Sequence, residues 1–403
     1  MLPEIPIAFI LLGLAAYTVL AGADFGAGFW TLVAGGGHAS RTATRDHARH
    51  AMGPVWEANH VWLIFVLVVC WTAYPVAFGS ITSTLAVPLF AAAVGIILRG
   101  AAYVLRPQLR QARAVESLFA LSSILTPFAL GTAVGAIASG RVPVGNAAGD
   151  PVTSWFNPTS LMIGTLAVAT SAYLAAVYLA ADAVRLGERA LEGDFRARAL
   201  WAGVAMGALA VAGLLVVRVD APSLWAGFVR GAGLAMVIVS GVAGVGTLML
   251  VWRRRYDPAR ISAALAVAAI VAGWGLAQRP TFLPGLTIEQ AAAGRSTLIA
   301  VIVSVAIGAV VLIPSLILLF GLFLHGHLDA SSETPERPSD IGRESAARRT
   351  RPIAIFAIAA LVIGVGFTFF GDQGWTFTIG VAGMVAGAGS AYFLAVTAPT
   401  VNA

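Results

Sequence analysis

The chain has 403 residues, of which 59% are hydrophobic and only 11% are charged, and its mean hydropathy is +0.86. This composition excludes a soluble globular protein and predicts an all-α polytopic integral membrane protein. All 25 basic residues are arginine, and the net charge is +6. The arginines lie mostly in short segments between apolar runs, which favours anionic membrane lipid over nucleic acid as their partner. The single cysteine, Cys70, excludes an internal disulfide and a cysteine-cluster metal site.

Runs of about 20 apolar residues predict eleven membrane-spanning helices. The first run lacks both the basic start and the small-residue cleavage site of a signal peptide, so we expect it to be a retained helix. The predicted spans are 6–33, 57–75, 84–105, 115–139, 159–184, 197–217, 224–252, 259–279, 297–323, 352–370 and 376–398.

The arginines divide unequally between the two sides of the membrane. Nineteen follow odd-numbered spans, namely Arg41, Arg45, Arg49, Arg106, Arg110, Arg113, Arg185, Arg189, Arg196, Arg198, Arg253, Arg254, Arg255, Arg260, Arg337, Arg343, Arg348, Arg349 and Arg351. Five follow even-numbered spans, namely Arg141, Arg218, Arg230, Arg279 and Arg295. The positive-inside rule therefore predicts an N-terminus outside and a C-terminus in the cytoplasm.

One long hydrophilic segment interrupts the pattern of spans. Residues 326–351 are rich in Pro, Ser and charged side chains, which predicts a disordered cytoplasmic linker. The expected organisation is thus a nine-helix body over 1–325, the linker over 326–351, and a two-helix membrane extension over 352–403.

Charged residues lie within three consecutive predicted spans. Asp24 lies roughly 27 Å along the first span, Glu57 is at the inner end of the second, and Arg99 lies about fifteen residues along the third. All three therefore reach the inner half of the bilayer, where pairing lowers the cost of a buried charge. Glu57 and His60 are spaced i, i+3 and share a helix face with each other.

Each of these residues also has an alternative interpretation. Glu57 could simply face the lipid headgroups, and Arg99 is more readily a structural counter-ion than a catalytic group. His60 could ligate a haem, although a lone histidine at a helix end is more often a hydrogen-bonding residue. His47 lies in an arginine-rich loop and is expected to be solvated. From the residues alone, a proton path, a cation-coupled secondary transporter and a non-catalytic oxidase subunit all remain open.

Several motifs resemble subunit II of cytochrome bd-type quinol oxidases. In order along residues 1–325 they are Gly22-Ala23-Asp24-Phe25-Gly26-Ala27-Gly28, Met52-Gly53-Pro54-Val55-Trp56-Glu57-Ala58-Asn59-His60-Val61-Trp62-Leu63-Ile64, Tyr74-Pro75, Leu98-Arg99-Gly100, Pro280-Thr281-Phe282-Leu283-Pro284-Gly285-Leu286-Thr287-Ile288 and Pro314-Ser315-Leu316. The nine-span body with an outside N-terminus agrees with the architecture of that family.

The resemblance implies a heterodimer with a subunit I of similar fold in a prokaryotic cell membrane. That partner would carry haem b, haem d and the quinol site, and would reduce dioxygen to water while generating a proton-motive force. Small accessory membrane subunits, membrane lipid and quinone are further expected partners.

For this chain, the resemblance implies a stabilising role with no catalytic residue, cofactor or metal ligand of its own. It places Glu57 and Asp24, together with His60 and Asn59, on a cytoplasmic proton path, with Arg99 and Asp24 as a structural ion pair. The chain departs from the family at its C-terminus, where the Gly- and Ala-rich extension predicts two helices packed peripherally on protein.

Overall fold

The computed structural model describes residues 2–33, 43–48, 56–105 and 113–324, and a few single helical positions between 356 and 390. It comprises two compact units, Met1–Leu312 and Ile313–Ala403. The predicted linker and the last two predicted spans lie outside the described residues except for those single positions, so the C-terminal extension stays a prediction.

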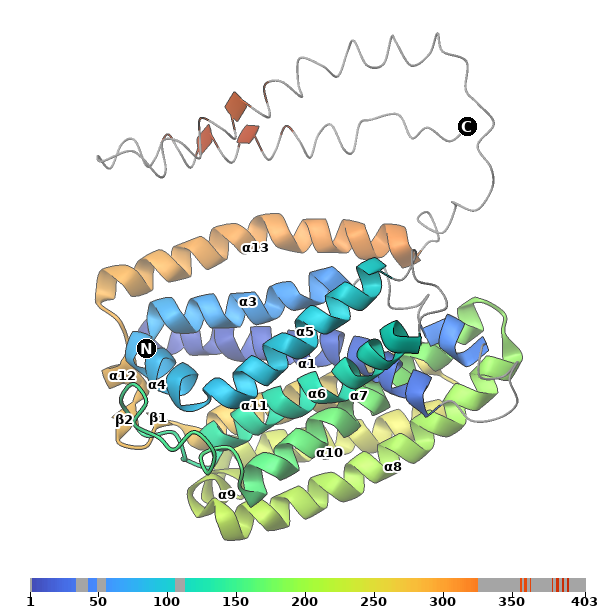
Figure 1. Ribbon diagram of the computed structural model, residues 1–403, viewed down its shortest axis with the longest axis horizontal. Coiled ribbons are helices and arrows are strands. Elements are labelled where there is room, and N and C mark those ends of the chain that lie inside the picture. Colours follow the sequence, from blue (N-terminus) through green and yellow to red (C-terminus); the bar gives the residue numbers. More distant parts are fainter. Residues whose placement is uncertain are drawn as a thin grey trace. The chain divides into compact units, whose positions relative to one another are not determined.

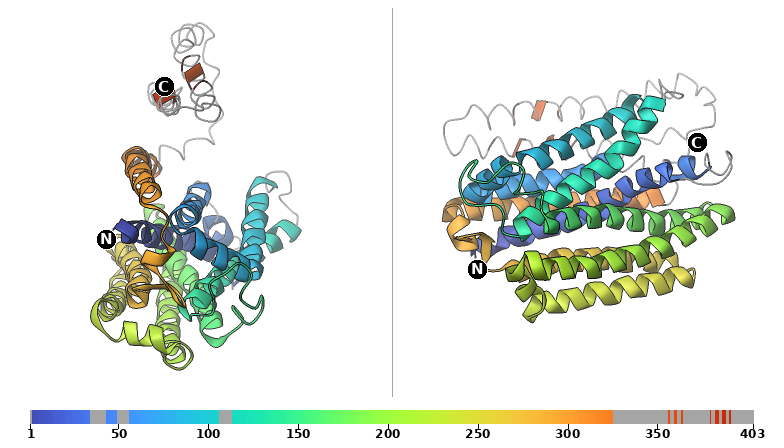
Figure 2. Two further views of the ribbon diagram at one scale, coloured as in Figure 1. Left: turned by 90° about the vertical axis from the view of Figure 1, so that its left-hand side faces the viewer. Right: turned by 60° about the horizontal axis from the view of Figure 1, so that its bottom comes forward.

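The first unit is built from long helices that run side by side (Figure 1; Figure 2). After a short 3₁₀ helix, Leu2–Glu4, the helices are α1 (Ile5–Leu32), α3 (Trp56–Ala73), α4 (Pro75–Thr84), α5 (Ala86–Leu105), α6 (Arg113–Ala138), α7 (Pro158–Arg185), α8 (Arg189–Asp220), α9 (Pro222–Phe228), α10 (Gly231–Trp252), α11 (Tyr256–Gln278), α12 (Ile288–Ala291) and α13 (Arg295–Leu324), which continues into the second unit. Residues 43–48 form a further short helix.

Seven helices among the described residues are long and apolar enough to cross a bilayer, or eight if α4 and α5 together form one broken span. Helices suit this environment because each satisfies its backbone hydrogen bonds internally where no water is available. The all-α, multi-pass membrane fold predicted from composition is therefore confirmed.

Most predicted spans agree with a helix to within a few residues, but α8 begins eight residues before the predicted span 197–217, and two further regions differ. The prediction of one continuous helix over 224–252 is wrong, because α9 ends at Phe228 and α10 begins at Gly231. Arg230 is extended and Gly231 has a φ of +54°, and a continuous run of apolar residues gives no sign of such a break. The sequence also did not predict α4, whose axis is bent by 82° from that of α5.

A β-hairpin and a short helix follow α11. Strands β1 (Thr281–Leu283) and β2 (Leu286–Thr287) pair antiparallel and lead into α12, whose start is closed by a capping box between Thr287 and Gln290. This hairpin lies at the same end of the unit as the N-terminus (Figure 1).

Helix α1 occupies the centre of the packing, with contacts to α3, α6, α7 and α11. Two glycines permit these close contacts. A Cβ on Gly26 would lie 1.8 Å from the Ser171 carbonyl oxygen of α7, and a Cβ on Gly28 would lie 1.9 Å from Ser123 Oγ of α6. The surrounding core contains four alanines of α7, and small residues of this kind let helix backbones approach closely in membranes.

Candidate functional site

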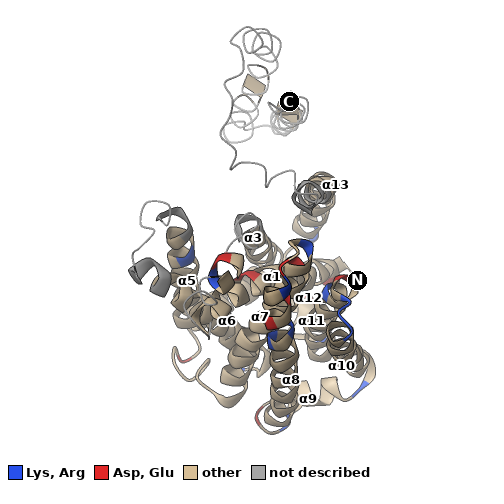
Figure 3. Cartoon of the chain, turned by 90° about the vertical axis from the view of Figure 1, so that its right-hand side faces the viewer, with Lys and Arg blue, Asp and Glu red and all other residues tan. Residues whose placement is uncertain are grey.

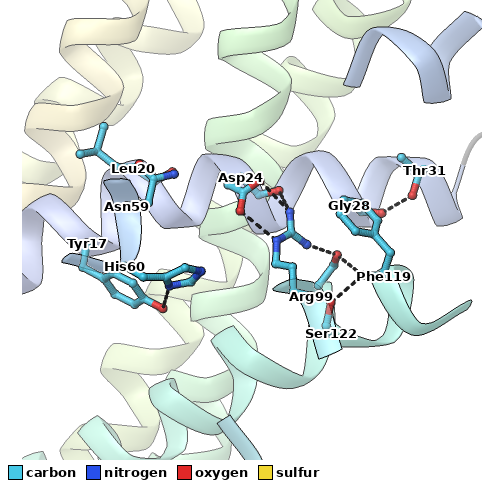
Figure 4. Close-up of polar contacts among 11 residues, drawn as sticks. Tyr17, Leu20, Asp24, Gly28, Thr31, Asn59, His60, Arg99, Phe119 and Ser122 are labelled. Atoms are coloured by element: carbon cyan, nitrogen blue, oxygen red, sulfur yellow. Dashed lines mark hydrogen bonds and ion pairs between the residues drawn. The ribbon is translucent and has the colours of Figure 1, made fainter. Parts of the chain in front are cut away.

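The centre of the candidate site is a buried ion pair between α1 and α5 (Figure 4). Arg99 Nε donates to Asp24 Oδ2 at 2.8 Å, and Arg99 Nη2 donates to Asp24 Oδ1 at 2.7 Å. The same Nη2 also donates to the Asp24 carbonyl oxygen at 2.7 Å. Both side chains are 0% exposed. This bidentate geometry is the arrangement in which a guanidinium and a carboxylate interact most strongly.

A third helix and two aromatic rings complete the surroundings of Arg99. Its Nη1 donates to Ser123 Oγ of α6 at 2.9 Å. The guanidinium carbon lies 4.3 Å from the ring centroid of Phe119 and 4.8 Å from that of Phe25, within the range of cation–π attraction. Arg99 thereby joins α5 to α1 and α6, and its charge is balanced deep inside the bundle.

A second polar group lies further along α1, towards its N-terminal end. The Tyr17 hydroxyl is 3.5 Å from Nδ1 of His60 on α3, and the two rings are in tilted contact. Next to His60, Asn59 Nδ2 donates to the Leu20 carbonyl oxygen at 3.3 Å. In an α-helix this carbonyl also faces the N–H of Asp24 one turn on, so Asn59 fixes the turn of α1 that presents Asp24.

These contacts fall on one face of α1, because residues three, four and seven apart lie on the same side of a helix. We call Tyr17, Leu20, Asp24, Gly28 and Thr31 the α1 polar face. Near the C-terminal end of α1, Thr31 Oγ1 donates to the Gly28 carbonyl at 2.7 Å, and Arg45 Nε donates to the Thr31 carbonyl at 3.3 Å. The face is roughly 21 Å long at 1.5 Å per residue. It connects an arginine of the first loop with a histidine of α3.

The structure therefore brings together four of the five residues selected from the sequence. Asp24 and Arg99 are in direct contact, and Asn59 and His60 reach the same face of α1. Glu57 belongs to α3 by its backbone, and its side chain lies outside the described part of the chain. The proton-path role of these residues stays a prediction.

Several residues of the site were not selected from the sequence, among them Tyr17 and Ser123. Tyr17 is seven residues before Asp24, so its spacing already placed it on the same helix face. Ser123, the partner of Arg99, gave no such signal, because it lies on α6 and a buried serine on an apolar helix is common.

The expectation that His47 is solvated is wrong. Its side chain is buried, its Nε2 lies 3.0 Å from the Leu179 carbonyl oxygen, and its ring contacts Phe195. The reason is that the helix of residues 43–48 packs against α7 and α8, a tertiary contact that the loop composition did not indicate.

The two histidines with described side chains both contact other groups of this chain. His60 packs between the rings of Tyr17 and Phe25 and places Nδ1 towards the Tyr17 hydroxyl, while His47 faces a backbone carbonyl. Among the described residues there is also no group of three or more His, Cys, Asp or Glu that could hold a metal ion.

Comparison with known proteins identifies the family. The family described as cytochrome bd terminal oxidase subunit II matches residues 2–323. A chain in the structure of the bd oxidase from Geobacillus thermodenitrificans is 27% identical, with a TM-score of 0.68 over 80% of this chain and 99% of that chain. No curated protein sequence matches. The chain belongs to the cytochrome bd terminal oxidase subunit II family, and so to a haem-containing oxidoreductase complex of the respiratory membrane.

Proposed function

We propose that this chain pairs with a haem-bearing subunit I in a quinol:oxygen oxidoreductase and forms part of the path that brings cytoplasmic protons to that partner. In this heterodimer, haem b, haem d and the quinol site belong to subunit I, where dioxygen is reduced to water. Taking protons from the cytoplasm for this reduction would generate a proton-motive force. This chain stabilises the partner and holds the polar groups of the path.

The α1 polar face is the observation that carries the proposal. Polar groups follow it from the arginine-rich end, at Arg45 and Thr31, past Asp24 and on to Tyr17 and His60. The excess of arginines at this end supports a cytoplasmic location by the positive-inside rule, with the N-terminus outside. Ionisable groups at membrane depth are costly and commonly mark proton relays.

Each residue has a distinct part in this proposal. Asp24 and Glu57 accept protons first, on the side of the α1 polar face nearer the arginine-rich end, and His60 is the titratable group further along it. Asn59 carries no proton itself but holds the turn of α1 that presents Asp24. Arg99 is the structural counter-ion, and proton transfer through Asp24 requires that carboxylate to exchange hydrogen bonds with Arg99.

Carboxylate-to-amide variants of the assembled oxidase test the proposal. Asp24→Asn and Glu57→Gln should slow quinol-dependent oxygen uptake by about tenfold or more, because an amide cannot carry a proton. The matched control is Asp257→Asn, which removes an exposed carboxylate of α11 away from the α1 polar face and should leave turnover unchanged. The visible spectrum of each purified complex verifies its haem content, so that turnover is compared only between assembled complexes.

The competing interpretations give different results. If assembled Asp24→Asn and Glu57→Gln complexes turn over at the normal rate, the subunit is purely structural and the proton role is wrong. If Asp24→Asn fails to assemble, Glu57→Gln decides the question alone. A chain that purifies without a haem-containing partner and exchanges a solute would support a secondary transporter instead.

We also propose that the chain extends beyond its nine-helix body, 1–325, through the linker 326–351 into a two-helix membrane extension, 352–403. These helices would take a peripheral position, as a small accessory subunit does. Deletion of residues 330–403 should impair assembly of the oxidase, measured as haem recovered with the purified complex. An unaffected complex would contradict this docking role.

A further inference from the structure

A cavity of about 530 Å³ lies at the arginine-rich end of the bundle, where α7 ends and where α8 and α11 begin. Figure 3 views the molecule towards this end, with Lys and Arg in blue and Asp and Glu in red. The polar residues lining the cavity are Arg189, Glu192, Arg254 and Tyr256, and Gly187 and the apolar Val184 also line it. None of these residues belongs to the α1 polar face.

Arg254 has an unusual backbone conformation for its residue type. Its φ is +57°, in the left-handed region that L side chains rarely adopt. Its N–H donates to the Val251 carbonyl at 3.0 Å, and the N–H of Arg255 donates to the Leu250 carbonyl at 2.8 Å. These two hydrogen bonds are the Schellman motif that ends a helix, and the position of Arg254 in that motif is usually glycine.

Two other helices of this chain end with the same motif and do use glycine. After α6 the residue is Gly140, with a φ of +70°, and after α7 it is Gly187, with a φ of +74°. Of these three motifs, only the one that ends α10 therefore carries a side chain in the disfavoured conformation. The backbone conformation at this position favours glycine, so it does not account for an arginine here. The arginine side chain lines the cavity, and we therefore expect its role to lie there.

The neighbours of Arg254 hold its guanidinium in place. Glu192, which is only 6% exposed, accepts hydrogen bonds from the Tyr256 hydroxyl and from Arg254 Nη1, the latter at 3.4 Å. The side chain of Arg254 nevertheless remains 64% exposed. The Glu192 carboxylate therefore positions the arginine while much of the guanidinium still faces the cavity and solvent.

Arg189 adds a second cation to the lining. It is exposed, and its side chain forms no hydrogen bond or ion pair with the residues that the structure describes, whereas its backbone N–H donates to the Gly187 carbonyl at 3.1 Å. Two guanidiniums thus line the cavity, and its one carboxylate already accepts two hydrogen bonds. Guanidiniums in such a setting suit a phosphate group, whose oxygens can accept paired N–H donors.

Exposed apolar side chains beside the cavity indicate a ligand with acyl chains. Val184, Leu186 and Trp252 all lie at helix ends next to the cavity and are more than half exposed. Tryptophan at a span end is typical of the membrane interface, and basic pockets between spans on the cytoplasmic side can hold lipid headgroups. We propose that this cavity binds the phosphodiester headgroup of an anionic phospholipid, held by Arg254 and Arg189.

The test measures stabilisation of the delipidated, assembled oxidase in detergent by added phosphatidylglycerol. The wild-type complex should show a saturable rise in its thermal unfolding temperature that phosphatidylcholine does not reproduce. Arg254→Gly should weaken the apparent affinity by about tenfold. It should also keep or raise the unfolding temperature without lipid, since glycine suits the conformation at this position.

Arg253→Ala is the matched control, because it removes an equal charge one residue earlier but outside the cavity lining. Its affinity should stay within about threefold of wild type. Arg189→Ala, which removes the other guanidinium of the lining, should weaken binding as Arg254→Gly does. Binding does not depend on proton transfer, so this result is independent of the proposed function.

Three results would overturn the proposal. An unchanged affinity in both Arg254→Gly and Arg189→Ala would mean that the cavity is not the site. Equal losses in Arg253→Ala and Arg254→Gly would show only diffuse attraction to the charged surface. Equal stabilisation by phosphatidylcholine, or by inorganic phosphate alone, would show that the ligand is not an anionic lipid.

Discussion

Two arginine–carboxylate pairs in this chain have the same chemistry but opposite surroundings. The Asp24–Arg99 pair is wholly buried, and its guanidinium is enclosed by α1, α6 and two aromatic rings. The Glu192–Arg254 pair lies at the end of the bundle, where the carboxylate is buried but the arginine is mostly exposed. The two pairs thus differ in burial, because both partners of the first are enclosed by protein, whereas in the second only the acid is enclosed and the base stays exposed to solvent.

The energetic reason lies in the cost of an unpaired charge. Removing one partner of a fully buried pair leaves the other charge in an apolar medium. The resulting loss of stability is far larger than the net stabilisation that the intact pair provides. Removing an exposed arginine leaves only a carboxylate that water and the Tyr256 hydroxyl can still satisfy. The same type of substitution should thus have very different consequences in the two regions.

The largest effect is expected from Arg99→Leu. It leaves Asp24 buried without its partner and should destabilise the complex by about 3–5 kcal/mol, measured by thermal unfolding of the purified oxidase. The double variant Asp24→Leu/Arg99→Leu removes both charges and should recover part of that loss. If the double variant is as unstable as the sum of the single variants, the two residues are not coupled and the comparison fails.

A smaller effect should follow from closing the space between α1 and α7. In Gly26→Ala the new Cβ would meet the Ser171 carbonyl oxygen at 1.8 Å, so the helices must separate. We expect a destabilisation of about 1–3 kcal/mol, as for overpacking elsewhere, with weaker attachment of Asp24 to Arg99 as a consequence.

Gly241→Ala is the control for that experiment, because a Cβ on this exposed glycine of α10 would meet no atom within 4 Å. It should be neutral, or stabilising by up to about 1 kcal/mol through higher helix propensity. Equal effects of the two substitutions on the unfolding temperature would contradict the close approach of α1 to α7.

The smallest effect is expected at the other end of the bundle, where Arg141 pairs with Asp220 at 2.6 Å. Arg141→Ala should cost less than about 1 kcal/mol, because an arginine exposed to this extent is screened by solvent. Asp220 would keep its hydrogen bonds from the Thr159 hydroxyl and N–H. The loss should shrink further at high salt, and a loss as large as that of Arg99→Leu would contradict the dependence on burial.

Much of the fold could be predicted from the sequence, because lipid leaves the backbone few alternatives to a helix of about 20 residues. The expectation that Asp24 and Arg99 lie at similar depth came from counting residues along the first and third predicted spans. The geometry of their contact did not follow, because it depends on Ser123 and on glycines that let three helices meet.

Other features depended on tertiary contacts or on single backbone angles. The burial of His47 requires the packing of a short helix on α7, and the break between α9 and α10 depends on the conformation of two residues. Arg254 looked like one of many topology-determining arginines, since nothing in its sequence context distinguishes a φ of +57° from ordinary helix.

The separation of Asp24 and Arg99 along the chain has a consequence for biosynthesis. Arg99 follows its partner by 75 residues, so α1 must enter the membrane before its counter-ion has been made. At typical rates of synthesis this interval lasts roughly 4–15 s. During that time the strong hydropathy of α1 alone must keep a lone acid in the lipid or at the insertion machinery. Insertion of α5 would then supply Arg99, and the ion pair with Asp24 would fix the position of α1 in the bundle.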